Sequence, residues 1–241
     1  MMKSTIKLVT FLFVATLFSS CNVQMFNGIT GNKNVVSENR NTKEDFSKIK
    51  VSTGLDLYLT QGASSKITVE ADENLQDIII TEVNNGVLKI YSEKNIWKAK
   101  ARKVYVTVKN LEELSATSGA NVYAKETIEI NNITISSTSG AMIQFSLDAN
   151  SVETNATSGS NIKVSGSTEN HTSSATSGAS IDAYELRSNN VTVSVTSGAD
   201  INIYASETID ARATSGGGID FKGNPKKVSK TSNSGGSISA K

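Results

Sequence analysis

The sequence predicts an all-β protein, a parallel β-helix whose coils are about 20 residues long. One observation is a tripeptide, Thr-Ser-Gly, that returns every 18 to 21 residues through the second half of the chain. Another is the alternation of apolar and polar residues after each copy, which is the period of a strand with one buried face. No helical period occurs between the copies. A unit this short cannot bury its apolar face alone, so it must stack on copies of itself.

The chain has 241 residues, a formal net charge of +1 and one cysteine. This length allows a large core without disulfide bonds, and the near-neutral charge gives no indication of a nucleic-acid partner. Residues 1–20 are typical of a signal peptide. Lys3 and Lys7 precede the apolar run LVTFLFVATLF, which is too short for a stable transmembrane helix. We expect this segment to be removed on export.

The cysteine, Cys21, follows the small residues of LFSSC, which resembles the lipobox of bacterial lipoproteins. The resemblance implies cleavage before Cys21 and acylation of the new N-terminus. We therefore expect a lipid anchor in the bacterial cell envelope, at the outer membrane, facing either the periplasm or the cell surface. A buried or incidental cysteine is the alternative. Residues 21–45 are polar, rich in asparagine and aperiodic, which is typical of a flexible tether.

Residues 46–115 contain one early copy of the coil and several further strands. In FSKIKVSTGLDLYLTQG, Gly54 is followed at the two inward positions by Leu57 and Leu59. Further along, the dipeptide Asn85-Gly86 separates two alternating segments, which predicts a β-hairpin. We expect this irregular N-terminal region to cap or begin the solenoid, because an open β-helix otherwise exposes an edge that favours aggregation. It should be continuous with the coils of residues 116–241.

Residues 116–241 are the repetitive coils, and two of their columns are predicted to point inward. Three residues past each repeat glycine stand Val122, Ile143, Ile162, Ile181, Ile201, Ile219 and Ile238. Two residues further on stand Ala124, Phe145, Val164, Ala183, Ile203, Phe221 and Ala240. The residues between these columns are mostly polar, as expected for an outward face. Stacked coils turn each column into a ladder of equivalent side chains.

The Thr-Ser-Gly copies are predicted to be structural turns. Their glycines are Gly119, Gly140, Gly159, Gly178, Gly198 and Gly216, and Gly235 is the glycine of a divergent last copy, Asn-Ser-Gly. Glycine adopts a left-handed conformation without a Cβ penalty. The serine is expected to hydrogen-bond the turn backbone, and stacked hydroxyls to bond along the column. A nucleophilic serine would need one privileged copy beside a histidine, whereas seven equivalent serines share the chain with a single histidine, His171.

The chain resembles the family of auto-transporter adhesins with a head GIN domain. The resemblance lies in FSKIKVSTGLDLYLTQG, the segment VEADENL, the hairpin NNGVLKIYSE, the strand VYVTV and the serial Ser-Gly-Ala turns, and it covers about residues 46–241. It implies a right-handed β-helix exported from a Gram-negative bacterium, often as a lipoprotein. No functional residues of the family carry over to this chain.

Few residues suggest chemistry, so we expect no enzyme, no cofactor and no metal site. The sequence offers no ligand spacing for zinc, no phosphate loop and no calcium-binding nonapeptide. His171 lies in the polar stretch STENHTSSA and is expected to be a solvated loop residue. Two outward columns form the candidate ligand surface, with acid, amide and tyrosine side chains suited to a glycan or a protein. Its members are Asp182, Tyr184, Asn202, Tyr204, Asp220 and Lys222.

Trp97 is the lone tryptophan and lies in EKNIWKAKARK, among five basic residues. This stretch suits contact with anionic headgroups, although an ordinary charged loop is the simpler interpretation. For the whole protein we favour a non-enzymatic envelope lipoprotein that acts as an adhesion or interaction surface. A carbohydrate-binding or polysaccharide-active protein that uses the candidate surface is one alternative, and a purely structural periplasmic scaffold is another.

Overall fold

The computed structural model describes residues 28–42, 44–124 and 126–241. The predicted signal peptide, Cys21 and the first part of the predicted tether lie outside these ranges. A short 3-10 helix spans Glu73–Ile78. The strands are β1 (Ile29–Thr30), β2 (Val35–Arg40), β3 (Lys48–Val51), β4 (Asp56–Gln61), β5 (Lys66–Asp72), β6 (Ile79–Asn84), β7 (Val87–Ser92), β8 (Ile96–Lys98), β9 (Arg102–Val108), β10 (Glu113–Ala116), β11 (Asn121–Ala124), β12 (Ile128–Thr138), β13 (Met142–Thr157), β14 (Asn161–Thr176), β15 (Ser180–Val195), β16 (Asp200–Tyr204), β17 (Thr208–Ala213), β18 (Gly218–Lys222), β19 (Lys227–Ser232) and β20 (Ser237–Ala240).

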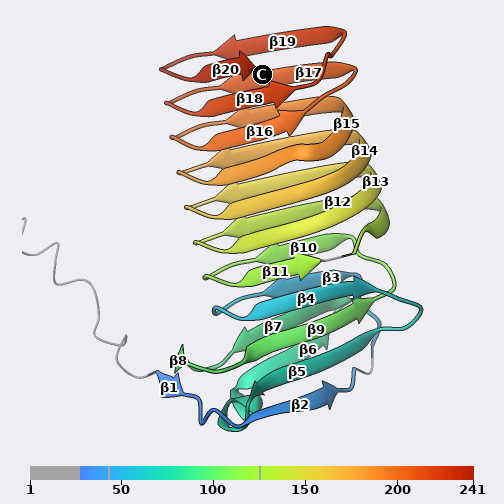
Figure 1. Cartoon of the computed structure of the whole chain (residues 1–241), viewed down its shortest axis with the longest axis vertical. Coiled ribbons are helices and arrows are strands. Elements are labelled where there is room, and N and C mark those ends of the chain that lie inside the picture. Colours follow the sequence, from blue (N-terminus) through green and yellow to red (C-terminus); the bar gives the residue numbers. More distant parts are fainter. Residues whose placement is uncertain (1–27, 43, 125) are drawn as a thin grey trace, which may run out of the picture.

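Two stacks of parallel strands run along the molecule and face each other across one core (Figure 1). The post-turn sheet contains the strands that follow each turn, namely β9, β4, β11, the first halves of β13 to β15, β16, β18 and β20. The pre-turn sheet contains β7, β3, β10, β12, the second halves of β13 to β15, β17 and β19. The solenoid has about 7 turns with a spacing of about 19 residues, so the predicted parallel β-helix is confirmed.

The Thr-Ser-Gly copies form the tight corner between the two sheets. All seven repeat glycines have φ between 66° and 78°, and the serine before each one is left-handed too, with φ between 50° and 56°. From Gly119 to Gly216, each glycine N–H donates to the serine carbonyl of the next coil at 3.1–3.2 Å. The threonine and serine hydroxyls approach each other within a turn, at 3.4–3.5 Å, so the prediction that hydroxyls bond along the column is wrong. Backbone groups join the corners of successive coils.

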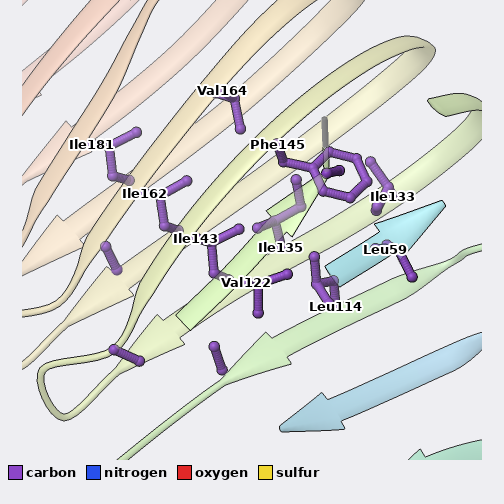
Figure 2. Close-up of a cluster of buried hydrophobic side chains, with 14 of the residues drawn as sticks. Leu59, Leu114, Val122, Ile133, Ile135, Ile143, Phe145, Ile162, Val164 and Ile181 are labelled. Carbon is purple, nitrogen blue, oxygen red and sulfur yellow. The ribbon is translucent and has the colours of Figure 1, made fainter. Parts of the chain in front are cut away.

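The two predicted inward columns are the core of the post-turn sheet. From Val122 to Ile219 the first column is at most 1% exposed, and from Ala124 to Phe221 the second is at most 6% exposed. Figure 2 shows how side chains of successive coils lie above one another, from Val122 through Ile143 and Ile162 to Ile181. Residue Ala240 departs from the prediction because it is exposed. It belongs to the last coil, where no further strand covers β20.

The N-terminal region contains the early coil and the hairpin that the sequence predicts. Leu57 and Leu59 are buried in β4, which pairs in parallel with β11 and thereby joins the early coil to the repeats. Strands β6 and β7 pair antiparallel around Asn85-Gly86, both of which have positive φ. Strand β5 pairs antiparallel with both β9 and β2, so this end of the post-turn sheet closes with reversed strands.

The tether predicted for residues 21–45 is too long. Residues Val35–Arg40 form β2 and pair with β5 over six residues. The sequence VVSENR lacks a buried face, because β2 is an edge strand whose side chains remain half-buried or exposed. Backbone pairing rather than burial defines this strand, and the alternation of apolar residues cannot reveal it.

Asp72 holds the loops of the N-terminal region together. Its carboxylate is fully buried and accepts the backbone N–H groups of Lys33 at 2.9 Å, Lys100 at 3.0 Å and Ala101 at 2.9 Å. Burial alone would raise the pKa of Asp72, but these backbone donors, with the charge of Lys100, bring the pKa below its usual value. Asp72 of VEADENL is therefore a structural residue.

Candidate interaction surface

One column of outward-facing side chains runs along the post-turn sheet, between the two inward columns. Strand pairing places its members in register, one from each coil. In spatial order they are Tyr105, Tyr58, Tyr123, Gln144, Lys163, Asp182, Asn202, Asp220 and Ser239. We call this set the outer column. The structure therefore brings together three residues of the candidate surface, Asp182, Asn202 and Asp220.

Lysines accompany both carboxylates of the outer column. The Lys163 ammonium lies 3.7 Å from the Asp182 carboxylate, and the Lys241 ammonium lies 3.2 Å from that of Asp220. These side chains are 37–58% exposed, so each pair contributes little to stability. The two acids stand two coils apart, roughly 10 Å at the spacing of neighbouring strands. This separation exceeds the usual range of about 6.5–9.5 Å for an inverting glycosidase.

The three remaining residues of the candidate surface, Tyr184, Tyr204 and Lys222, lie just beside the outer column. The Lys222 ammonium lies 4.1 Å from the centroid of the Tyr184 ring. The Tyr204 ring is covered by the guanidinium of Arg187 at 4.4 Å. Burial, with added effects of the Asp220 and Asp182 carboxylates, raises the pKa of Tyr184. The two rings thus present cation–π pairs, and the sequence did not suggest Arg187.

At the other end of the outer column, three tyrosines form a stack that sequence reasoning missed. The ring centroids of Tyr58 and Tyr105 are 5.1 Å apart, and those of Tyr58 and Tyr123 are 5.3 Å apart, with planes inclined by 21° and 26°. Beyond Tyr123 an open groove of about 590 Å³ is lined also by Gln144 and by Ser146 and Ser165. The available signal was position, because Tyr58 and Tyr123 both stand four residues after a turn glycine.

The expectation that His171 is a solvated loop residue is wrong. His171 lies within β14, is 1% exposed, and pairs in register with Val152 and Val191. Its Nε2 is 3.0 Å from the Thr154 hydroxyl, which in turn donates to Ser173 Oγ at 2.9 Å. The Nδ1 atom has no hydrogen-bond partner among the described residues. Burial lowers the pKa of His171 to about 4, so the ring is neutral near pH 7.

This buried cluster is not a nucleophilic site. Ser173, like Thr154 and His171, is at most 1% exposed, so no substrate reaches its hydroxyl. Across residues 28–42, 44–124 and 126–241, no group of three or more His, Cys, Asp and Glu side chains is arranged to hold a metal ion. No helix in the same ranges is long and apolar enough to cross a membrane.

The structure is a parallel solenoid that displays columns of polar and aromatic side chains, and its one histidine is buried. It therefore belongs to the class of repeat proteins that offer an extended surface. Within that class, this chain belongs to the family described as putative auto-transporter adhesin, head GIN domain, whose model matches residues 45–225. The resemblance seen in the sequence is confirmed.

Solved structures of similar fold include proteins from Bacteroides and Parabacteroides species. A putative adhesin from Bacteroides fragilis superposes with a TM-score of 0.80 at 23% identity, covering 89% of this chain and 100% of the other. A putative lipid binding protein from Parabacteroides distasonis gives 0.73 at 21% identity, with the same coverage. A putative adhesin from Parabacteroides merdae gives 0.73 at 20% identity, covering 89% and 99%. No curated protein matches the chain.

Proposed function

We propose that this protein is a lipid-anchored component of the bacterial cell envelope that binds glycans or glycosylated partners through its outer column, without catalysing a reaction. The outer column is the observation that carries the proposal. It aligns hydroxyl, amide and carboxylate groups at the regular spacing of the coils, beside aromatic rings. Such a surface offers many weak contacts in a row, which suits an extended polar ligand.

Membership of an adhesin family supports a binding role, and the chemistry of the column argues against a hydrolase. Asp182 and Asp220 are separated by one intervening strand and each has a lysine partner. A separation of two coils, roughly 10 Å, is wider than the distance between the two catalytic carboxylates of glycoside hydrolases. Anchoring rests on the apolar segment before Cys21 and on the small residues that precede this cysteine.

The binding role is tested on a glycan array with the unacylated protein. We expect saturable binding to a subset of glycans and at least a tenfold weaker signal for Asp182→Ala with Asp220→Ala. The matched control is Glu153→Ala with Thr172→Ala, which alters two exposed residues of the pre-turn sheet. Binding that survives in the Asp182 and Asp220 variant, or that is lost equally in the control, contradicts the outer column as the site. Release of reducing sugar from a bound glycan contradicts the absence of catalysis.

The anchor and its orientation are tested in cells. We expect labelled palmitate to be incorporated into the wild type and not into Cys21→Ser. Protease accessibility on intact cells then distinguishes a surface-exposed adhesin from a protein that faces the periplasm. Failure of the wild type to incorporate palmitate contradicts the anchor.

A further inference from the structure

The first described residues of the chain lie against strand β8, which carries the only tryptophan, Trp97. Strand β1 pairs in parallel with β8, and the N–H of Ile29 donates to the carbonyl of Asn95 at 2.7 Å. The N–H of Gly31 donates to the carbonyl of Lys98 at the same distance. A Cβ at Gly28 would lie 2.9 Å from the Cβ of Trp97. The segment that begins at Cys21 therefore enters the fold beside Trp97.

Trp97 is the most exposed large hydrophobic side chain of the described residues. It is 61% exposed, whereas the next, Val228, is 48% exposed. The adjacent residue Ile96 packs against the core and fixes β8 in place. Trp97 thus extends from a strand that is fixed to the core into solvent, and packing of the core does not explain its exposure. An indole of this kind is favoured at the boundary between water and lipid, where one part is apolar and the other polar.

Three lysines lie within three residues of this tryptophan in the sequence. Lys94, Lys98 and Lys100 are all exposed, and none of them forms an ion pair with any described residue. The nearest acid in the sequence is Glu93, whereas the carboxylate of Asp72 is buried and held by backbone N–H groups. We call Lys94, Trp97, Lys98 and Lys100 the Trp97 patch. Its positive charge complements anionic headgroups, because each lysine near an anionic bilayer adds to the free energy of binding.

The length of chain before Gly28 limits how far the patch can stand from an anchor. Seven residue steps separate Cys21 from Gly28, a span of at most about 25 Å for a fully extended chain. Figure 1 shows β1 and β8 near the end of the molecule that is opposite to β19 and β20. An acyl chain on Cys21 would therefore bring this end, rather than the last coils, to the membrane.

We propose that the Trp97 patch docks on the surface of an anionic lipid bilayer, with the indole at the interface and the three lysines on the headgroups. The proposal deepens the proposed anchoring and uses Cys21 only for the length of the tether. The patch itself acts without acylation. Docking holds the N-terminal end on the bilayer and directs the long axis of the solenoid away from it.

The test uses the chain from residue 21 onward carrying Cys21→Ser, which keeps all described residues and cannot be acylated. Vesicles of phosphatidylglycerol with phosphatidylethanolamine are compared with vesicles of phosphatidylcholine alone, by sedimentation and by tryptophan emission. Because Trp97 is the only tryptophan, its emission reports on the patch alone. We expect sedimentation with the anionic vesicles, a blue-shifted emission and quenching by brominated acyl chains. All three effects should weaken as salt is raised.

Variants locate the contact. We expect Lys94→Gln, Lys98→Gln and Lys100→Gln together to reduce partitioning onto anionic vesicles about 100-fold, and Trp97→Ala to reduce it about tenfold. The control makes the same change of charge at the far end, Lys226→Gln with Lys227→Gln and Lys230→Gln, and should bind as the wild type does. Equal binding to neutral vesicles, an unchanged emission, or equal loss in the control overturns the proposal.

Acylation is scored separately, so the two proposals fail independently. Palmitate incorporation without vesicle binding by the unacylated chain rejects the Trp97 patch and leaves the anchor. Vesicle binding without palmitate incorporation rejects the anchor and leaves the patch.

Discussion

His171 makes the stability of this protein depend on pH above the range in which carboxylates titrate. Burial lowers the pKa of its ring from an ordinary 6.5 to about 4 in the folded state. The unfolded chain therefore binds a proton at a pH where the folded chain does not. Stability is constant above about pH 6.5 and falls as the pH decreases toward 4.

The magnitude follows from the distance between the two pKa values. Each pH unit between them changes the free energy of unfolding by about 1.4 kcal/mol, so lowering the pH from 7 to 5 costs about 2 kcal/mol. The full loss, near pH 4, is about 3 kcal/mol. Because the chain has one histidine, no other imidazole titrates in this window.

His171→Val is the variant that isolates this effect. Valine continues the column of Val152 and Val191, and Thr154 keeps its hydrogen bond to Ser173. The variant also removes Nδ1, an unpartnered buried acceptor, so we expect it to be more stable than the wild type by about 1 kcal/mol at pH 7.

Urea unfolding followed by circular dichroism at pH 7, 6 and 5 measures the free energies. We expect the wild type to lose about 2 kcal/mol over this range and His171→Val to lose almost none. His171→Gln controls for polarity, because it keeps a hydrogen-bonding side chain that does not titrate. A wild type of equal stability at pH 7 and pH 5, or a His171→Val variant with the same slope as the wild type, would refute the reasoning.

Three further predictions test the turns, the N-terminal region and the coils. Gly178→Val should lower the unfolding free energy by about 1–2 kcal/mol and Gly178→Asn by less, because φ is 68° and a Cβ there meets no atom within 4 Å; equal losses in thermal melts would contradict a purely conformational role. Asp72→Asn should lower the free energy of urea unfolding by about 2–3 kcal/mol, since the amide cannot accept all the N–H groups that the carboxylate accepts. Below about pH 4 this variant should lose less stability than the wild type does, because it has no carboxylate to protonate at this position. Deleting residues 178–197 should leave a folded solenoid that is one strand spacing shorter, about 4.8 Å by small-angle scattering, whereas Ile181→Asp should unfold the region around it. A folded Ile181→Asp variant with a wild-type melting temperature would contradict the inward assignment.

The core of the coils was predictable because the repeat glycine gives every strand a fixed origin. Counting three residues forward from each glycine reaches Ile143, Ile162 and Ile181, all buried. Counting seven residues backward reaches Val152, His171 and Val191, which share one column of the pre-turn sheet. His171 was therefore identifiable as an inward residue by position. Its polar neighbours in STENHTSSA suggested a loop, because serine and threonine here occupy inward positions that aliphatic residues occupy in other coils.

The candidate surface was predictable only in part. Asp182, Asn202 and Asp220 share a column because the coils are in register there. The pairing of β14 with β15 shifts between Lys163 and Ser165, and this irregularity cannot be read from glycine spacing. Contacts beyond it, such as Arg187 over Tyr204, depend on where the extra residue of that coil is accommodated. Strand β2 was missed for a different reason, since its backbone pairing has no apolar pattern.

The uniform turns also determine how far each coil lies from the N-terminal region. Strand pairing along the post-turn sheet runs from β9 through β4, β11, β13 and β14 to β15, so five strand spacings, roughly 24 Å, separate the N-terminal region from Asp182. With the Trp97 patch on a bilayer, this distance is the height of Asp182 above the N-terminal end of the outer column. Each inserted or deleted coil would change that height by one spacing while leaving both ends intact. Relatives with different numbers of coils could therefore present the same chemistry to partners at different distances from the membrane.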